Sequence, residues 1–244
     1  MKNDTQIFGI RAVIEAIQSN KTIDKLFIQK GLQGPLIKEL LSLVRKEGIN
    51  ISYVPVEKLN RLTKKNHQGV FANISPIEFH DLEHLVLNTF ESGKTPLFII
   101  LDQLSDVRNF GAIIRTAECT GVNGIIIQKK GGAPVSADTV KTSAGAIFKI
   151  PICKVDHIKD AIFYLQGSGI QVVAASEKAS NTVYDMDLKV PLGIVMGSEG
   201  KGVSPSVLKT VDHIAKLPMY GTIASLNVSV ACGVFLYETL RQRI

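Results

Sequence analysis

The stretch LPMYGTIASLNVSVACGVFLYETLRQR at residues 217–243 changes from a loop to a helix, with small polar groups at the change. From Leu226 onward, apolar or small residues recur three or four positions apart, which predicts a helix packed against a core. These residues are Val230, Gly233, Val234, Tyr237 and Leu240. Ser225 directly precedes the pattern and is expected to cap the helix. Capping is the commoner role of such a turn, but Ser225, Asn227 and Ser229 together beside free backbone N–H groups also suit a ligand.

Upstream, short apolar runs rich in β-branched residues alternate with helical patterns from residue 97 onward. This alternation predicts an α/β fold with a parallel sheet and helices on both faces. The predicted strands are 97–102, 124–129, 148–152, 170–175 and 192–197. Ligands of such sheets bind beyond the carboxyl ends of the strands. The loops that follow these strands are therefore where a site is expected.

A helix is predicted after the first of these strands. Its apolar face comprises Phe110, Ile113, Ile114, Ala117 and Gly121. Asn109 falls near the helix start, and Arg115 interrupts an otherwise apolar segment. An arginine taken alone usually pairs with a surface carboxylate, but the apolar flanks of Arg115 favour a functional role.

The segment GSEGKG at residues 197–202 follows the last predicted strand. Its glycines permit close approach of a ligand to the backbone, and Glu199 is its one carboxylate. A dinucleotide site would carry its glycine-rich turn after the first strand, in the order G-x-G-x-x-G. The glycine order here therefore argues against an ordinary nucleotide-binding Rossmann protein, although a glycine loop can also be only a turn.

The N-terminal third is basic, with 12 Lys and Arg against 6 Asp and Glu in residues 1–75. Helices are predicted at 11–18, 35–46 and 56–62, and strands at 25–30, 49–56 and 70–74. A basic surface attracts nucleic-acid phosphates, so the loop with Lys64, Lys65, His67 and Gln68 is interpreted as an RNA contact in preference to a plain surface turn. Residues 76–95 are acidic and bounded by prolines, which predicts a linker between domains 1–75 and 96–244.

Several classes of protein are not expected. The chain contains no run of about 18 uncharged apolar residues and no basic start followed by an apolar run, so neither a membrane span nor a secretion signal is predicted. Cys119, Cys153 and Cys232 are odd in number and widely spaced, so reduced, buried thiols and a cytoplasmic location are expected. His80 and His84 lack further ligands nearby, and no metal is expected.

Three motifs carry a resemblance to a known family. NFGAIIR with Asn109 and Arg115, MGSEGKG with Glu199, and SLNVSVA with Ser225 and Asn227 together resemble the SpoU (TrmH) family of RNA ribose 2′-O-methyltransferases. The N-terminal third, with FGIRAVIEAI and HQGV, is similar to the ribosomal-protein-like substrate-binding domain of the large-subunit rRNA guanosine methyltransferases in that family. The resemblance implies a SPOUT-type parallel sheet with a C-terminal trefoil knot, a homodimer, and catalytic roles for these five residues.

The resemblance also implies S-adenosylmethionine as cofactor. Its pocket would be walled by Gly197, Leu217, Met219 and Leu226, with Ser143 and Gly145 nearby. Methyl transfer to a ribose hydroxyl is an in-line displacement, so the protein aligns the reacting groups and manages one proton. Arg115 either takes that proton, which a guanidinium seldom does, or stays charged and stabilises the developing alkoxide. Arg108 is expected to contact RNA phosphate.

The expected function is therefore methyl transfer from S-adenosylmethionine to a ribose 2′-hydroxyl of structured RNA, with a guanosine of 23S rRNA favoured over tRNA. The alternative from another class is a non-catalytic RNA-binding factor in ribosome assembly. The intact set Asn109, Arg115, Glu199 and Asn227 argues against it, because a degenerate enzyme would be expected to have lost at least one of them.

Overall fold

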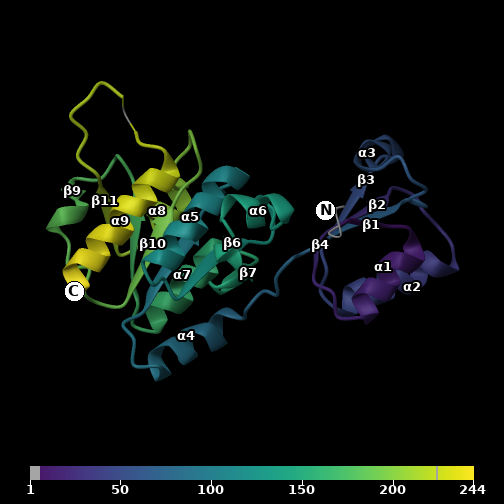
Figure 1. Ribbon diagram of the computed structural model, residues 1–244, viewed down its shortest axis with the longest axis horizontal. Coiled ribbons are helices and arrows are strands. Elements are labelled where there is room, and N and C mark those ends of the chain that lie inside the picture. The colour runs from purple at the N-terminus through teal and green to yellow at the C-terminus, as the bar shows by residue number, and fades with distance from the viewer. Residues whose placement is uncertain (1–5, 224) are drawn as a thin grey trace. The chain divides into compact units, whose positions relative to one another are not determined.

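The computed structural model describes residues 6–223 and 225–244, which form two compact units (Figure 1). The first unit comprises the described residues up to 78 together with Val135–Ala137, and the second comprises Phe79–Pro134 and Asp138–Ile244. No helix among the described residues has the length and apolar character that a membrane span requires.

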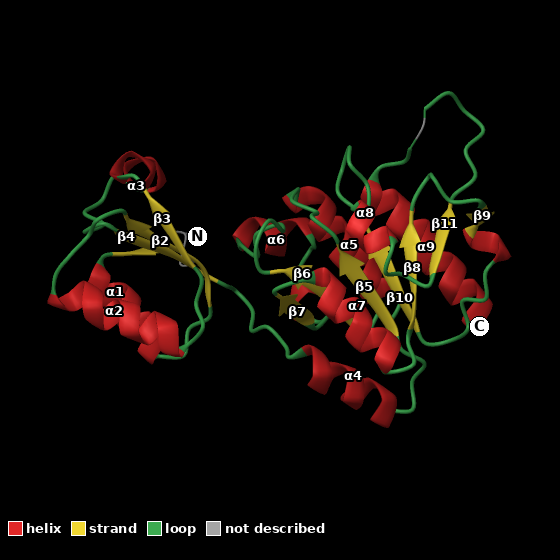
Figure 2. Ribbon diagram, turned by 180° about the vertical axis from the view of Figure 1, so that it is seen from behind, coloured by secondary structure: helices red, strands yellow, loops and turns green. Residues whose placement is uncertain are grey.

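The first unit is a four-stranded sheet with helices on both faces. The strand order is β1 (Gln6–Phe8), β4 (Val70–Ile74), β2 (Ile23–Gln29) and β3 (Ile51–Val54). Helices α1 (Ile10–Gln18) and α2 (Pro35–Lys46) pack on one face, and α3 (Val56–Leu62) lies on the other (Figure 2). The predicted ranges 35–46, 56–62 and 70–74 are confirmed, because Pro35, Pro55 and Gly69 mark their starts locally. Strand β1, three residues long, was too short to be predicted.

The prediction of a linker at 76–95 is wrong for most of that segment. Helix α4 (Leu82–Glu91) belongs to the second unit, where Val86 is 1% exposed and lies in the same core cluster as Phe98 and Ile162. Leu82 and Leu85 pack against this cluster, so α4 buries one apolar face. The acidic residues that suggested a connector lie on its exposed face.

The second unit is a seven-stranded sheet in which every strand pair is parallel. The strand order is β7 (Ile152–Val155), β6 (Gly124–Gln128), β5 (Leu97–Leu101), β10 (Leu192–Met196), β8 (Gln171–Ala175), β11 (His213–Lys216) and β9 (Asn181–Thr182). The predicted α/β class with a parallel sheet is confirmed. Strands β9 and β11 were not predicted, because they are short and lack a continuous apolar run.

Two predictions for this unit need correction. The predicted strand 148–152 is wrong, because Ala146–Phe148 forms a 3₁₀ turn in which the Phe148 N–H donates to the Gly145 carbonyl. Pairing begins only at Ile152, opposite Ile125. The three cysteines are free thiols, but Cys119 is exposed, whereas Cys153 and Cys232 are buried as predicted.

Helices cover both faces of this sheet. The side chains of Phe98, Ile126 and Val172 form one core cluster with α4 and with α7 (Ile158–Gly167). Alternate strand residues point to the opposite face. There α5 (Val107–Cys119) packs along α9 (Val228–Arg243), which also contacts β10. The remaining short helices are α6 (Ala137–Thr142), η2 (Val183–Asp185) and α8 (Pro205–Leu208).

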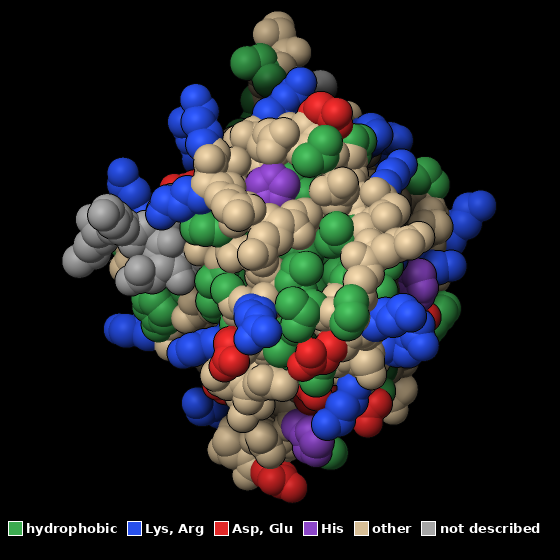
Figure 3. All heavy atoms as spheres, turned by 90° about the vertical axis from the view of Figure 1, so that its right-hand side faces the viewer, with side chains coloured by type: hydrophobic (Ala, Val, Ile, Leu, Met, Phe, Trp, Pro, Cys, Tyr) green, Lys and Arg blue, Asp and Glu red, His purple; other side chains and the backbone are tan. Residues whose placement is uncertain are grey.

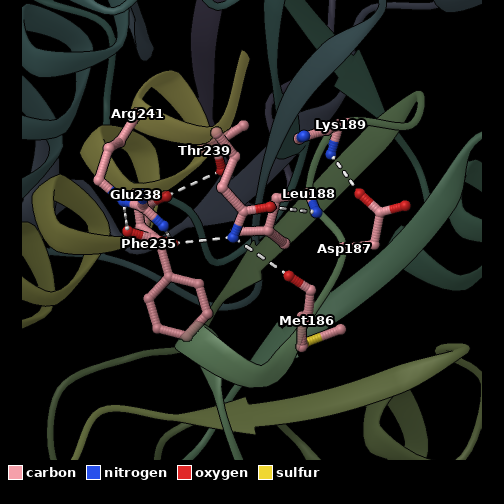
Figure 4. Close-up of polar contacts among 9 residues, drawn as sticks. Met186, Asp187, Leu188, Lys189, Phe235, Glu238, Thr239 and Arg241 are labelled. Carbon is pink, nitrogen blue, oxygen red and sulfur yellow. Dashed lines mark hydrogen bonds and ion pairs between the residues drawn. The ribbon is translucent and has the colours of Figure 1, made fainter. Parts of the chain in front are cut away.

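Polar contacts tie the C-terminal turn of α9 to the segments that precede β5 and β10. Glu238 accepts hydrogen bonds from Arg241 and Gln242, which hold the pKa of its carboxyl at about 2 (Figure 4). Gln242 also donates to the Met186 carbonyl. The Arg243 guanidinium donates to four carbonyls, those of Thr95, Pro96, Leu188 and Val190.

We expect Arg243→Met to lower the free energy of unfolding by roughly 3 kcal/mol, because a part-buried carbonyl left without a donor costs about 1–3 kcal/mol. Three of the four contacts are part-buried, and the contact to Thr95 is exposed. Arg241→Met is the matched control. The Arg241 side chain is 69% exposed, and its partner Glu238 keeps the hydrogen bond from Gln242, so we expect a smaller loss of about 1 kcal/mol. Urea denaturation measures both, and equal losses in the two variants would contradict an anchoring role for Arg243.

Candidate active site

A cavity of about 520 Å³ opens at the carboxyl ends of β10, β8 and β11. Its walls come from the loops after β8 and β10, from the segment after β11, and from the start of α9. Seven of the predicted site residues line it: Gly197, Glu199, Leu217, Met219, Ser225, Leu226 and Asn227. The chain thus brings two of the three motifs to the edge of the sheet where α/β proteins bind ligands.

The glycine loop 197–202 folds back on itself. Ser198 and Gly202 exchange two backbone hydrogen bonds of 3.1 and 2.9 Å, and Gly200 and Gly202 have φ of 78° and 68°. A β-carbon on Gly197 would overlap the backbone of Gly202 and Val203. The residue at 197 must therefore be glycine for the loop to close beside the cavity.

Asp102 supports this loop and was missed as a functional position. It is 2% exposed, and its Oδ2 accepts a 2.7 Å hydrogen bond from the Ser204 N–H, across 102 positions of sequence. The sequence contained a signal for this role. Asp102 directly follows the buried strand β5, and a carboxylate buried there needs a hydrogen-bond partner.

Asn227, and not Ser225, caps α9. Its Oδ1 accepts hydrogen bonds from the backbone N–H groups of Ser229 and Val230, at 2.9 and 3.3 Å. The predicted cap at Ser225 is therefore wrong, and Ser225 instead lines the cavity. The helix starts two residues later than predicted because the amide of Asn227 satisfies its first turn.

The side chain of Asn227 also contacts the motif NFGAIIR, through Asn109. Its Nδ2 donates a 3.0 Å hydrogen bond to Oδ1 of Asn109, 118 positions away. Asn109 is held in the first turn of α5, where Asp106 caps the helix by accepting from the N–H groups of Arg108 and Asn109. The amide pair therefore links the start of α5 to the wall of the cavity.

Other predicted residues lie outside the cavity walls. Arg115 is exposed on α5, and Arg108 is exposed in its first turn. Ser143 is buried and donates to the Val140 carbonyl, and Gly145, with φ of 82°, begins the 3₁₀ turn that follows. A single chain therefore does not bring Arg115 to the cavity.

Some side chains of the loop predicted to contact RNA are hydrogen-bonded within the first unit. Lys64 and Lys65 are exposed, but His67 is 9% exposed, its Nδ1 accepting from the Gly69 N–H and its Nε2 contacting Asn60 Oδ1 at 2.9 Å. Gln68 Oε1 accepts from the Ile10 N–H at the start of α1. We therefore correct the role of His67 to shaping the loop, because both of its ring nitrogens already serve it. Gln68 shapes the loop through Oε1 but is exposed, so its contact with RNA stays a prediction.

The loop after β8 was not considered as part of the site, although Ser176, Glu177 and Lys178 line the cavity. The Ser176 N–H donates to the Ala215 carbonyl, which holds this loop against β11. Its position after a parallel strand was the available signal. Among the described residues, no group of three or more His, Cys, Asp or Glu side chains is arranged to hold a metal ion.

A parallel sheet with a glycine-edged cavity at its carboxyl ends is characteristic of α/β proteins that bind a small molecule there. Residues 96–237 match the SpoU rRNA methylase family, and residues 6–80 match the family of RNA 2′-O ribose methyltransferase substrate-binding domains. The chain belongs to the SpoU rRNA methylase family. It is an S-adenosylmethionine-dependent RNA methyltransferase, as are the members of that family.

Relatives and solved structures agree with this assignment. The chain is 37% identical over 237 residues to YacO of Bacillus subtilis (strain 168), named as a TrmH family tRNA/rRNA methyltransferase, covering 97% of this chain and 95% of the relative. It is 26% identical to an AdoMet-bound rRNA methyltransferase from Sinorhizobium meliloti, with a TM-score of 0.63 over 98% of this chain and 88% of the other. A TrmH/SpoU tRNA modifying enzyme of A. aeolicus is 32% identical, with a TM-score of 0.56 over 66% of this chain and 84% of the other.

The cavity fits S-adenosylmethionine. Its volume lies within the range of about 300–1,000 Å³ that is usual for cofactor pockets, and Gly197 lets the glycine loop close along one wall. Leu217, Met219 and Leu226 offer apolar contacts, and Glu177 and Glu199 offer carboxylates. The cofactor, when bound, supplies a methyl group activated on a positively charged sulfur.

Proposed function

We propose that this protein methylates the ribose 2′-hydroxyl of a guanosine in 23S rRNA. The observation that carries the proposal is the amide bridge between Asn109 and Asn227, because it joins two motifs at a cavity whose wall includes the third, at Glu199. The match of residues 6–80 to a 2′-O ribose methyltransferase substrate-binding family supports the ribose as acceptor. The resemblance of this part of the chain to the large-subunit rRNA guanosine methyltransferases favours rRNA and guanosine. The proposal places the protein in the cytoplasm.

In the proposed mechanism, the polar groups at the cavity hold the nucleotide so that its hydroxyl faces the methyl carbon. Asn109 and Asn227 fix each other, and Glu199 is carried on a closed loop. Arg115 has the two open roles of accepting the hydroxyl proton or stabilising the alkoxide as a cation. The second role requires no change in the ordinary protonation of a guanidinium.

We further propose that the active unit is a homodimer, in which Arg115 of one copy serves the cavity of the other. Arg115 is exposed and lies outside the cavity of its own chain. Apolar side chains of α9 and of the segment before it are also exposed, including Tyr220, Ile223, Val230 and Tyr237 at 98, 74, 52 and 56%. Such a group is characteristic of a surface that another protein covers. The C-terminal trefoil knot implied by the resemblance is part of the same proposal.

Two alternatives remain as outcomes of the test. The names of the relatives include tRNA as well as rRNA, so tRNA is the second substrate candidate. A non-catalytic RNA-binding assembly factor is the second class of function, and the basic N-terminal third is what favours it.

Methyl-labelled S-adenosylmethionine, incubated with unmodified large-subunit rRNA or bulk tRNA, distinguishes these outcomes. We expect label on one rRNA ribose, and a loss of roughly 10²- to 10³-fold in Arg115→Ala, the usual cost of removing a group that stabilises developing charge. Arg11→Ala, at an exposed position of α1, is the matched control. Label on tRNA alone would make tRNA the substrate. Donor binding without transfer to either RNA would point to another RNA or a missing ribosomal protein, and no donor binding at all would leave the assembly factor.

A further inference from the structure

The sheet of the first unit carries an ordered aromatic row on the face away from α1 and α2. Phe8 on β1 pairs with Phe71 on β4, which also pairs with Phe27 on β2. The neighbouring residues along these strands, Ile7, Ala72 and Leu26, belong to the core formed with α1 and α2. Because side chains alternate along a strand, the three phenylalanines project from the opposite face.

Helix α3 covers this aromatic row only in part. Phe71 is 1% exposed and packs in a small cluster with Val54 and Leu59. Phe8 and Phe27 are packed against that cluster but remain half-buried. The partly exposed rings of Phe8 and Phe27 thus lie on either side of the buried Phe71. Their strands are two strand spacings apart, about 10 Å.

Each half-buried ring is accompanied by a lysine. The Lys65 Nζ lies 5.4 Å from the centre of the Phe8 ring, and the Lys58 Nζ lies 5.4 Å from the centre of the Phe27 ring. Both lysines are exposed. A cation near a ring face is attracted by the ring electrons, which limits the motion of the lysine. The face therefore presents two pre-positioned pairs of a cation and an aromatic ring.

A polar row runs beside the aromatic row. Gln6 pairs with Asn73, and Asn73 pairs with Lys25. Each of these three residues lies two positions from the phenylalanine of its own strand, so its side chain projects from the same face as that phenylalanine. Gln6 is exposed, and Asn73 and Lys25 are half-buried. These side chains offer amide donors and acceptors and a third cation, and neither row contains a carboxylate.

We propose that this face, defined by Phe8, Phe27, Lys25, Lys58, Lys65, Gln6 and Asn73, binds an unpaired segment of the substrate RNA. A nucleotide needs a ring for its base, a cation for its phosphate and amides for its base edge, and the two rows supply all three side by side. The 12 to 6 excess of basic over acidic residues in 1–75 complements the negative charge of RNA. On the side of the molecule that Figure 3 faces, Lys and Arg side chains are more widespread than Asp and Glu side chains. The inference rests on the proposed action on RNA and adds the form of RNA and the surface that holds it.

Binding of the full-length protein to a short uridine oligonucleotide and to an RNA duplex of the same length tests the face. We expect preference for the single strand, and weakening by about 5- to 150-fold in Phe8→Leu and Phe27→Leu, the range observed on losing one stacked base. Leucine keeps most of the apolar contact with the cluster, and thermal unfolding checks that each variant is folded. The double variant Lys58→Gln/Lys65→Gln should reduce the slope of log affinity against log salt by about 1.4, or about 0.7 for each phosphate that the variant no longer neutralises.

The control is Lys38→Gln, since Lys38 is exposed on α2, on the other side of the sheet. An equal loss in this control, unchanged binding in both phenylalanine variants, or preference for the duplex would overturn the proposal. Its failure is distinguishable from failure of the proposed function. In the first case the variants still methylate RNA like the wild type, and in the second the wild type transfers no methyl group to any RNA.

Discussion

Replacing Gly197 with alanine should abolish binding of S-adenosylmethionine. The added methyl group would lie within the backbone of Gly202 and Val203, so the loop 197–202 would have to open. This loop is closed by the two hydrogen bonds between Ser198 and Gly202 and forms a wall of the cavity. We expect affinity to fall by at least about 100-fold, and the free energy of unfolding by about 1–3 kcal/mol, as for other overpacked sites. Isothermal titration calorimetry and urea denaturation measure the two effects.

Gly221→Ala is the matched control for this change. No atom of the described residues lies within 4 Å of the position of an added β-carbon at Gly221, and its φ is outside the left-handed region. We expect its stability to change by less than about 0.5 kcal/mol and its cofactor affinity to be unchanged. Normal binding by Gly197→Ala would show that the cofactor occupies a different place.

Substitutions of Asn227 should separate its two roles. Asn227→Ser keeps an oxygen that can cap α9, but its shorter side chain no longer reaches Asn109. We expect little change in stability and a loss of methyl transfer of up to about 100-fold, since small misplacements of reacting groups have effects of that size. Asn227→Ala should in addition lower stability by about 1 kcal/mol, because the cap is lost.

Asn109→Ala tests the same hydrogen bond from its other side and should reproduce the loss of activity. The double variant Asn109→Ala/Asn227→Ser should be no worse than the more affected single variant, because both changes remove one shared hydrogen bond. Asn88→Ala, at an exposed position of α4, is the control and should retain full activity. Additive losses, or full activity in Asn109→Ala, would show that the amide bridge does not position the site.

The elements predicted most accurately are those with boundary signals in their own residues. Helix α2 begins at Pro35 and ends after a basic last turn, and helix α3 follows Pro55. The parallel sheet was predicted from its buried apolar strands, and the glycine loop from its composition. These features depend on neighbours within a few positions, so periodicity and propensity determine them.

The incorrect predictions concern residues whose role depends on distant partners. Ser225 and Asn227 both suit a helix cap, and His67 resembles an exposed loop histidine until Asn60 and Gly69 occupy its ring nitrogens. The segment with α4 resembles a linker until its apolar face meets the core of the second unit.

The sequence by itself determined the class of fold, the order of the three motifs and seven of the residues that line the cavity. Only the tertiary structure decided that Asn227 meets Asn109, that Asp102 holds the loop after β10, and that Phe8, Phe71 and Phe27 form one row. Local patterns specify which face of an element is buried. Contacts between residues 102 or 118 positions apart depend on strand order and register, which are selected by the packing of the whole core and are not encoded in any single segment.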